Sequence, residues 1–555
     1  EPANTVAVEW LTNILAIENI EWEARREREF WRQIHAGRKI KVTPKLPKTD
    51  LHKSAERCLK SKRPRGLWDD QVLDRQVDAY RVLGDMPEAT LDLVDPDVAT
   101  RYGCRDADAT QRVRPHLWNK IVGMGLEKTY DLELATYPLI DRMHTIGFKP
   151  DLGHMAAFSD QLAFHVADLQ IELEQLVGIE GWNANSGDQV EDYLFNTLHL
   201  PGGKRTSTGR HSTNKKILEG LEKEFGADYP VISKILEYRQ TYKLKNTFVD
   251  RLPDFVNRFP YDGRVHATFR TTRVVTGRLA ASDPNLLAQP KHGKFAKDFR
   301  RGWIADPGHV LCSWDQSQVE LRVLADLSQD PALLRAFREG LDLHAQLAVK
   351  IFGGTEDDHK KGKGRLAAKA INFGIPMGMQ AQGLTVELRK NGVMVDQGDA
   401  QRWLDETMMT YAEVPRYQKW MIAEARRNGY IQCMSGRIRY IGGIKSWDDY
   451  TRGEAERFAF STPIQEGAQY IMKTAEKRVW EDVIQGFWHQ GRYLEPIVQI
   501  HDDLVMEAED DKAFLIELNE AMKWAMTETF HGLSVPLATS GDAGYNWQDM
   551  EEIAT

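Results

Sequence analysis

The segment from Val310 to Ser328 most constrains the fold of this chain. Its apolar run, Val310 to Cys312, is typical of a strand, and the apolar residues from Val319 to Leu327 recur at helical spacing. Asp315 is therefore expected where a strand passes into a helix. Such a junction holds a carboxylate still and leaves it open to solvent, although an Asp at a strand end is more often a turn or cap residue.

A second acidic site lies near the other end of the chain. Two short β-rich runs within Ile497–Glu507 flank His501, Asp502 and Asp503, which predicts a hairpin with acidic residues at its tip. If the two elements are neighbours, Asp315 and Asp502 can share a pair of divalent cations, as in phosphoryl transfer. The alternative is a surface hairpin with solvated Asp residues.

Arg365, Lys369 and Phe373 recur every four residues between these two sites. In a helix they lie on one face over about 12 Å, at a rise of about 1.5 Å per residue. Two cations followed by an aromatic ring fit a nucleoside triphosphate, with its phosphates against Arg365 and Lys369 and its sugar and base near Phe373. The spacing fits a solvated basic face with one core aromatic equally well.

Together, the three stretches resemble the motifs of the DNA polymerase I family (family A). The family's first palm motif, DYSQIELR, is matched from Asp315 to Arg322, with Gln316 in place of the Tyr. The fingers-helix motif, R-x3-K-x3-F-G-x2-Y-G, is matched except that Met377 replaces the Tyr. The last palm motif, HDE, corresponds to His501, Asp502 and Asp503.

The resemblance extends from about Tyr130 to Trp547. It implies an α+β multidomain chain: a right-hand polymerase of palm, fingers and thumb, preceded by a partial exonuclease-like α/β domain. The implied boundaries are 1–125 for an N-terminal segment and the partial 3′–5′ exonuclease-like domain, 126–260 for the thumb and connecting helices, 261–330 for the first part of the palm, 331–480 for the fingers, and 481–555 for the C-terminal part of the palm.

The resemblance also implies roles for single residues. Asp315 and Asp502, with the backbone carbonyl of Gln316, are expected to hold two Mg²⁺ ions, for which Mn²⁺ can substitute. Lys369 is expected to act in catalysis by protonating the leaving pyrophosphate. The expected nucleotide-binding residues are Arg365, Lys369, Phe373, Glu320 and His344. The expected DNA-binding residues are Arg278, Lys204, Arg205, Arg210, Met377, Arg457, Gln465 and His501. Asp503 is one methylene shorter than the family's Glu. It is expected to support the residues that bind the metal without binding the metal itself.

The segment Lys204–Lys216 is rich in Lys, Arg and hydroxyl side chains and contains no acidic residue. Such a loop suits contacts with a phosphate backbone, which position a duplex without reading its sequence. A solvated flexible loop is the alternative.

The amino-acid composition limits which partners and compartments suit this chain. The formal net charge of -9 would argue against nucleic acid if it were spread evenly, but local fields decide such binding. The four cysteines lack metal-ligand spacing, which indicates a reducing compartment. No apolar run is long enough to span a membrane, and no signal peptide is visible. We expect a monomer that binds primer–template DNA and dNTPs in the cytoplasm of a bacterial or phage-infected cell, with an organelle as the alternative setting.

The N-terminal part is harder to interpret. Residues 1 to about 50 predict a charged, Trp-containing helix, and the initial Glu suggests a trimmed or processed N-terminus. The stretch from His52 to Trp118 resembles the end of the family's exonuclease domain, where Tyr102 and Asp106 match a metal-binding Tyr and Asp. Two exposed residues one helical turn apart are the commoner explanation. Because no Asp-x-Glu precedes Asp106, we expect this chain not to proofread.

Two other functions stay open. A single-subunit RNA polymerase shares this palm, but Glu320 should obstruct a ribose 2′-hydroxyl. A catalytically impaired DNA-binding protein is favoured by the departures at Gln316, Met377 and Asp503. Met377 lacks the π face of the family's Tyr, and Pro376 is expected to bend or end the fingers helix.

Overall fold

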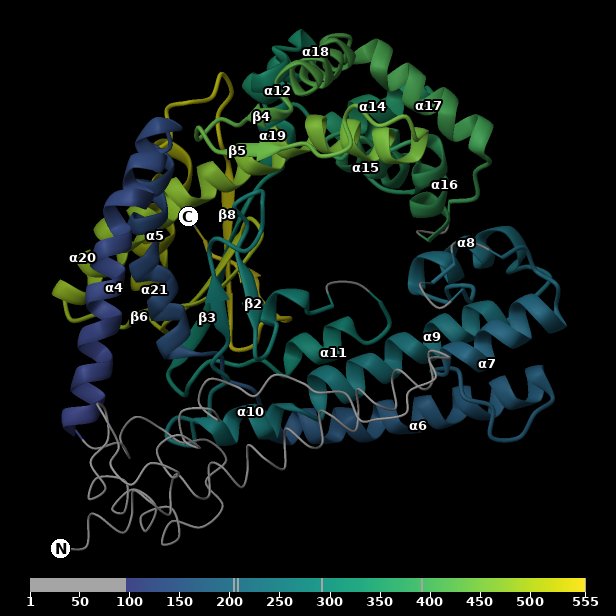
Figure 1. Ribbon diagram of the computed structural model, residues 1–555, viewed down its shortest axis with the longest axis horizontal. Helices are drawn as coiled ribbons and strands as arrows, with labels where there is room; N and C mark the ends of the chain where they lie inside the picture. Colours follow the sequence, from purple (N-terminus) through teal and green to yellow (C-terminus); the bar gives the residue numbers. More distant parts are fainter. Residues whose placement is uncertain (1–95, 203–204, 207–208, 291–292, 391–392, 555) are drawn as a thin grey trace, which may run out of the picture. The chain divides into compact units, whose positions relative to one another are not determined.

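The computed structural model describes residues 96–202, 205–206, 209–290, 293–390 and 393–554. The chain divides into two units, of which the larger comprises Gly125–Thr206 and Arg210–Thr555. The smaller unit is described chiefly through helix α4 (Pro96–Gly123), which Figure 1 shows in purple. The predicted N-terminal helix and most of the exonuclease-like stretch lie outside the described residues.

An antiparallel sheet with strand order β6-β7-β3-β8-β9 carries the acidic residues of both predicted sites. Its strands are β3 (His309–Gln316), β6 (Leu494–Ile500), β7 (Asp503–Glu509), β8 (Thr539–Gly544) and β9 (Glu551–Glu552). The strand that passes into a helix is confirmed, since β3 is followed by α12 (Val319–Ser328). The hairpin is also confirmed, since β6 and β7 pair in antiparallel fashion around the Asp502 turn.

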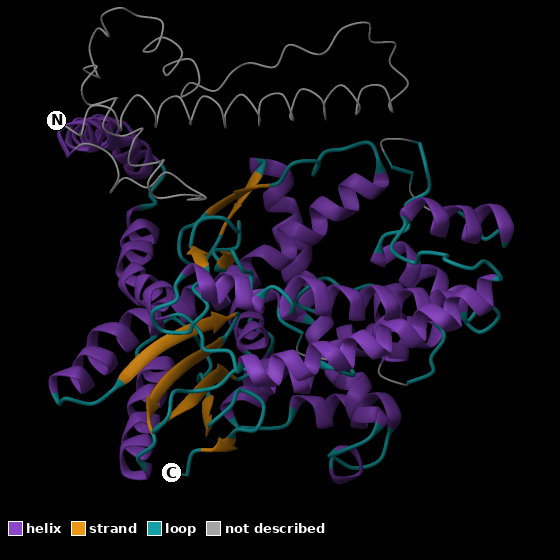
Figure 2. Cartoon of the chain, turned by 90° about the horizontal axis from the view of Figure 1, so that it is seen from below, coloured by secondary structure: helices purple, strands orange, loops and turns teal. Residues whose placement is uncertain are grey.

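Helices cover both faces of this sheet, whose strands are orange in Figure 2. The helices that pack against it are α5 (Glu127–Ile146), α6 (Leu152–Val177), α11 (Ala296–Arg301), α19 (Asp449–Arg478) and α21 (Lys512–Lys523). Side chains alternate along a strand, so Cys312 and Trp314 enter the core shared with α5, α19 and α21. Leu311 enters the opposite core with α6 and α11. Ser313 and Asp315 follow Leu311 on that second face.

The remaining elements between 126 and 290 are mostly helical. They are α7 (Gly187–Glu191), α8 (Lys215–Phe225), α9 (Val231–Lys243), α10 (Leu252–Arg258) and the short hairpin β1 (Thr268–Arg270) and β2 (Ala280–Ser282), with π-helical turns at Asp192–Thr197 and Leu244–Val249. The C-terminal half of α6 packs against α8 and α9 through a separate apolar cluster that includes Leu173, Leu218 and Ile235. One long helix therefore joins this cluster to the sheet.

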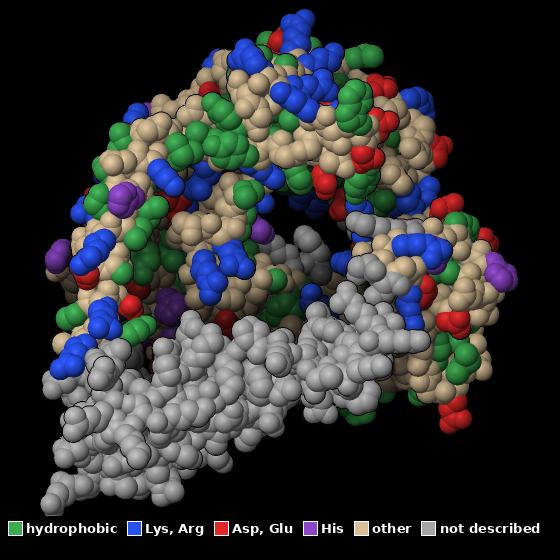
Figure 3. All heavy atoms as spheres, viewed as in Figure 1, with side chains coloured by type: hydrophobic (Ala, Val, Ile, Leu, Met, Phe, Trp, Pro, Cys, Tyr) green, Lys and Arg blue, Asp and Glu red, His purple; other side chains and the backbone are tan. Residues whose placement is uncertain are grey.

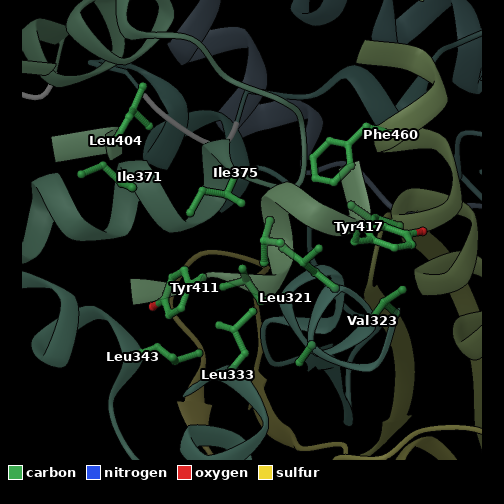
Figure 4. Close-up of a cluster of buried hydrophobic side chains, with 14 of the residues drawn as sticks. Leu321, Val323, Leu333, Leu343, Ile371, Ile375, Leu404, Tyr411, Tyr417 and Phe460 are labelled. Carbon is green, nitrogen blue, oxygen red and sulfur yellow. The ribbon is translucent and has the colours of Figure 1, made fainter. Parts of the chain in front are cut away.

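The segment after α12 is a helical layer built on the largest apolar cluster among the described residues. Its elements are α13 (Pro331–Arg338), α14 (Leu343–Phe352), α15 (Lys363–Gly374), α16 (Ala381–Lys390), α17 (Gln397–Thr410), α18 (Glu413–Asn428), β4 (Tyr430–Gln432) and β5 (Ile438–Tyr440). Figure 4 shows how Leu321 of α12, Ile371 of α15 and Phe460 of α19 contribute to one interior. None of the described helices combines the length and hydropathy needed to cross a bilayer.

Helix α19 buries charged groups as well as apolar ones. Lys473 donates to Glu133 of α5, and Arg437 donates to the same carboxylate from β4–β5. Glu476 is fully buried, and neither of its carboxyl oxygens has a hydrogen-bond partner among the described residues. Burial raises the pKa of Glu476 from its ordinary 4.5 to about 8, with Lys473 opposing the rise and Glu133 adding to it.

This carboxyl group should make stability fall as pH rises. The folded chain keeps the Glu476 proton up to a pKa of about 8, whereas the unfolded chain loses it near the ordinary value of 4.5. Between these values the folded state binds more protons, so the free energy of unfolding falls with pH. We expect Glu476→Gln to stabilise the protein by an amount that grows from pH 5 to pH 8, measured by urea unfolding. The exposed Glu551→Gln is the matched control, and parallel pH curves for parent and Glu476→Gln would contradict the assignment.

Candidate functional site

The structure brings Asp315 and Asp502 together, as the sequence predicts. Asp315 is exposed at the end of β3, between the buried Trp314 and Gln316. The next backbone amide, Gln316 N, donates to the carbonyl oxygen of Asp502 at 3.0 Å. The two carboxylates therefore come from adjacent chain segments at one end of the sheet. The Gln316 side chain points the other way, and its amide donates to the carbonyl of Met526 at 3.1 Å.

The turn that carries Asp502 is held by two buried glutamines. His501 has a φ of 62°, the left-handed conformation that non-glycine residues adopt rarely. Its carbonyl oxygen accepts from the side-chain amides of Gln499 at 2.8 Å and Gln469 at 3.2 Å. Sequence reasoning missed both. Gln499 could have been noticed as a polar residue inside an otherwise apolar strand, whereas Gln469 of α19 carries no such signal.

Asp503 lies directly opposite Asp315 in the β3–β7 register. Only 6% of its surface is exposed, and one carboxylate oxygen accepts from the Ser313 hydroxyl at 2.5 Å. The guanidinium of half-buried Arg300 lies 4.2 Å from the ring centre of Trp547; partial burial lowers the Arg300 pKa, and the charge of Asp503 opposes this. The Asp503 carboxylate is thus held within the sheet face rather than at its open end.

Glu320 and Arg278 form an ion pair beside these carboxylates, with Arg278 Nη2 donating to Glu320 Oε1 at 2.5 Å. Burial raises the pKa of Glu320, Arg278 opposes the rise, and the Asp502 carboxylate adds to it. Glu320 belongs to the first turn of α12, immediately after the β3 strand. The predicted DNA-binding residue Arg278 and the predicted nucleotide-binding residue Glu320 therefore contact each other in this structure.

The donor atoms suit a hard divalent cation. Carboxylate and carbonyl oxygens are the ligands that Mg²⁺ prefers, and it commonly binds one or two carboxylates with substrate phosphates and water. Across the described residues, no group of three or more His, Cys, Asp or Glu side chains could hold a metal ion by itself. The arrangement fits two neighbouring metal-ion sites whose coordination would be completed by a main-chain oxygen, a nucleotide and water.

The predicted row on α15 is present. Lys369 and Phe373 are exposed and Arg365 is half-buried, while the opposite face of the helix packs into the core. Lys369 Nζ lies 5.6 Å from the centre of the Phe373 ring. Arg365 donates to Asp342, a residue that sequence reasoning missed and that also caps α14 through the backbone amides of His344 and Ala345.

His344 lies on α14, with its ring centre 5.9 Å from that of Phe373. Burial lowers the pKa of His344 to about 4; Asp342 opposes the change, whereas Arg365 and Lys369 add to it. The ring is therefore neutral at physiological pH. Its Nδ1 lies 3.0 Å from the side-chain nitrogen of Asn372, a buried residue that immediately precedes Phe373.

Helix α15 ends at Gly374, just before Pro376, as expected for a residue that lacks a backbone donor. Beyond this end, the Gln465 amide lies 2.8 Å from the Met377 sulfur. Arg457 packs beside Gly378, because a Cβ on that glycine would lie 3.5 Å from Arg457 Cγ. Three predicted DNA-binding residues, Met377, Arg457 and Gln465, are thus brought together between α15 and α19.

Other predicted residues lie outside this cluster. Arg205 and Arg210 belong to the loop before α8, where Arg205 pairs with His211 in a β-bridge and Arg210 forms an ion pair with Asp188. Lys204 lies outside the described residues. On the face shown in Figure 3, Lys and Arg side chains, in blue, border a hollow in the larger unit.

Tyr102 and Asp106 lie on α4, in the smaller unit, one helical turn apart. Tyr102 is exposed, and a hydrogen bond with Asp106 raises the pKa of its hydroxyl. This geometry is that of two solvent-facing residues on a single helix.

Paired carboxylates at the end of an antiparallel sheet, and a helix that presents two cations and a ring, are the features expected from the resemblance to a right-hand polymerase. The model of the family "DNA polymerase family A" matches residues 153–549 of this chain. The chain therefore belongs to DNA polymerase family A.

Relatives and solved structures agree with this assignment. The chain is 34% identical over 485 residues to "DNA polymerase I, thermostable" of Thermus aquaticus, covering 84% of this chain and 56% of the relative. It is 34% identical over 465 residues to "DNA polymerase I" of Rhizobium leguminosarum, covering 83% and 44% respectively. The chain thus spans about half the length of these curated relatives. A similar solved structure is the POL domain of Pol1 from M. smegmatis in complex with DNA primer-template and dNTP, with a TM-score of 0.68, 27% identity and coverage of 89% of this chain and 78% of that one.

Proposed function

We propose that this chain is a DNA-directed DNA polymerase that adds dNTPs to the 3′ end of a primer paired with a template. The observation that carries the proposal is the position of Asp315, at the end of β3, next to Asp502, in the turn between β6 and β7 of the same sheet. The M. smegmatis complex, whose title names a primer-template and a dNTP, supports the same substrates for this chain.

Asp315, Asp502 and the backbone carbonyl of Gln316 would hold two Mg²⁺ ions. When bound, such ions lower the pKa of the primer 3′-hydroxyl and stabilise charge on the leaving pyrophosphate. The protein fixes the two carboxylates through strand pairing, so little reorganisation accompanies the reaction. Asp503 supports the site indirectly, since its carboxylate is engaged with Ser313.

The fingers residues would bind the triphosphate. Arg365 and Lys369 lie on the exposed side of α15 and would neutralise phosphate charge, while Phe373 would contact the sugar and base. Lys369 would also supply the proton that leaves with pyrophosphate. His344 is neutral at physiological pH and would bind a phosphate oxygen through a ring N–H.

The template and primer would bind along a second group of residues. Arg278 and His501 are placed near the paired carboxylates, and Met377, Arg457 and Gln465 form the cluster beyond α15. The loop that includes Arg205 and Arg210 would contact the phosphate backbone without reading sequence. Binding through many cations should weaken steeply as salt increases.

A second part of the proposal concerns 3′–5′ exonuclease activity. Tyr102 and Asp106 offer a single carboxylate, and the sequence holds no Asp-x-Glu before Asp106, so we propose that the chain, acting as a monomer, extends primers without shortening them from the 3′ end. Primer extension with dNTPs, with NTPs and with no nucleotide tests the proposal against its alternatives. Extension with NTPs alone would favour an RNA polymerase, and binding without extension would favour an inactive DNA-binding protein.

Replacing either paired carboxylate should abolish synthesis but not DNA binding. A lost metal ligand is worth several kcal/mol in the transition state, so extension by Asp315→Asn or Asp502→Asn should fall on the order of 10³-fold or more. Affinity for primer–template should change little, because it depends on many Lys and Arg contacts. Single-turnover extension and a binding titration measure the two effects, with exposed Asp254→Asn as the control. Near-normal turnover in Asp315→Asn would refute the metal assignment.

Glu320 should exclude ribonucleotides by its size. Glu320→Ala opens space beneath the sugar and should raise ribonucleotide insertion relative to dNTP insertion by about tenfold or more. Glu320→Gln keeps the volume and loses the charge, so it should retain most of the discrimination. Single-nucleotide insertion kinetics compare the three proteins. Equal discrimination by parent and Glu320→Ala would remove the steric role, and loss of discrimination in Glu320→Gln would show that the Arg278 ion pair carries it.

A further inference from the structure

Asn372 is a buried polar residue next to the proposed nucleotide site. None of its surface is exposed, and it immediately precedes Phe373, whose side chain faces solvent on α15. Its amide lies against the ring of His344 on the neighbouring helix α14. A buried amide between two helices stabilises packing in many proteins, but here its partner is the imidazole expected to meet the triphosphate.

The orientation of the Asn372 amide is set by the backbone carbonyl of Leu343, because the nearby Tyr411 hydroxyl can donate or accept and so fits either orientation. The Asn372 nitrogen donates to the carbonyl of Leu343 at 3.4 Å, and a carbonyl can only accept. Its oxygen accepts from the hydroxyl of Tyr411 at 3.5 Å. Figure 4 shows the Tyr411 ring at the edge of the apolar cluster, beside Leu343. The nitrogen of Asn372 must therefore face His344.

This orientation determines where the imidazole proton lies. The Asn372 nitrogen donates and does not accept, so at 3.0 Å the His344 Nδ1 must offer its lone pair. A neutral imidazole with Nδ1 as acceptor carries its proton on Nε2.

We infer that Asn372, oriented by the Leu343 carbonyl, holds His344 as the Nε2–H tautomer, so that the ring donates a hydrogen bond to a phosphate oxygen of the incoming dNTP. The inference rests on the proposed function and adds a positioning residue to it. In the other tautomer, a lone pair would face phosphate oxygens and repel them.

The charged groups around the ring favour its neutral form. Arg365 and Lys369 on α15 disfavour the charged ring, Asp342 at the N-cap of α14 opposes them, and Tyr411 borders Asn372 with Asp330 nearby. With two cations facing it and water excluded, the ring binds a proton only in acid, at a pKa of about 4. A neutral imidazole contributes one donor, so the tautomer decides whether that donor reaches the substrate.

The first test measures the tautomer directly in the whole chain. Nitrogen-15 NMR of histidine-labelled protein distinguishes protonated from unprotonated ring nitrogens, and loss of signal in His344→Gln assigns the resonances. We expect a protonated Nε2 and an unprotonated Nδ1 at pH 7. A proton on Nδ1 in the parent protein would overturn the inference, whatever any variant does. This result is independent of synthesis, so a parent that fails to extend primers would refute the proposed function alone.

The second test uses the nearly isosteric Asn372→Asp. A carboxylate beside Nδ1 attracts a proton there, so His344 should become charged at low pH and hold the wrong neutral tautomer at high pH. We expect KM for dNTP near the parent value at pH 6 and about tenfold higher at pH 8.5, as for loss of one hydrogen bond to a charged group. The parent should show no such rise, and primer–template affinity should be unchanged.

The double variant separates positioning from packing. In a His344→Ala background, Asn372→Asp should no longer produce the pH-dependent rise in KM. The same rise in both backgrounds, or a flat pH profile in Asn372→Asp, would overturn the inference and leave Asn372 as a packing residue.

Discussion

The pairing of β3 with β7 is the constraint on which the rest of this site depends. Because side chains alternate along a strand, slipping this register by one residue would move Asp315 to the opposite face of the sheet. Apolar cores on both faces prevent such a slip, with Trp314 in one and Leu311 in the other. The same register puts Asp503 opposite Asp315 and brings the Asp502 backbone to Gln316.

The buried charges on this face of the sheet have polar or charged partners. Glu507, opposite Leu311, is fully buried and accepts from Arg264 at 2.6 Å, and Arg264 also donates to Asp306 at 2.7 Å. Asp503 is nearly buried and engaged by Ser313, whereas Asp315 at the strand end is exposed. A charge deep in the sheet must have partners, so a carboxylate that is to meet a metal and a substrate has to lie at the open end.

Local patterns in the sequence were sufficient to predict helices and strands. They did not predict which residues from separate elements contact one another. The strand before Asp315, the hairpin around Asp502 and the exposed row on α15 follow from periodicity and turn residues within short windows. The links of Arg278 to Glu320, of Arg365 to Asp342 and of Asn372 to His344 join residues from separate elements, and no spacing rule relates them. The proposed domain boundaries and the role of the N-terminal stretch stay predictions, since residues 1–95 lie outside the described part of the chain.

If Arg365 binds a triphosphate as proposed, its ion pair with Asp342 would hold the arginine in position before the nucleotide arrives. Both side chains are about one-third exposed, so water screens their attraction and the pair contributes little to stability. In the proposed function, a triphosphate would offer Arg365 more charge and a bidentate geometry, so exchanging Asp342 for phosphate would cost little and gain a stronger contact. Asp342 then remains bonded to the first amides of α14, beside His344. The acidic residue thus keeps the arginine in position without competing strongly for it, while the neutral His344 adds no positive charge that would need a second counterion.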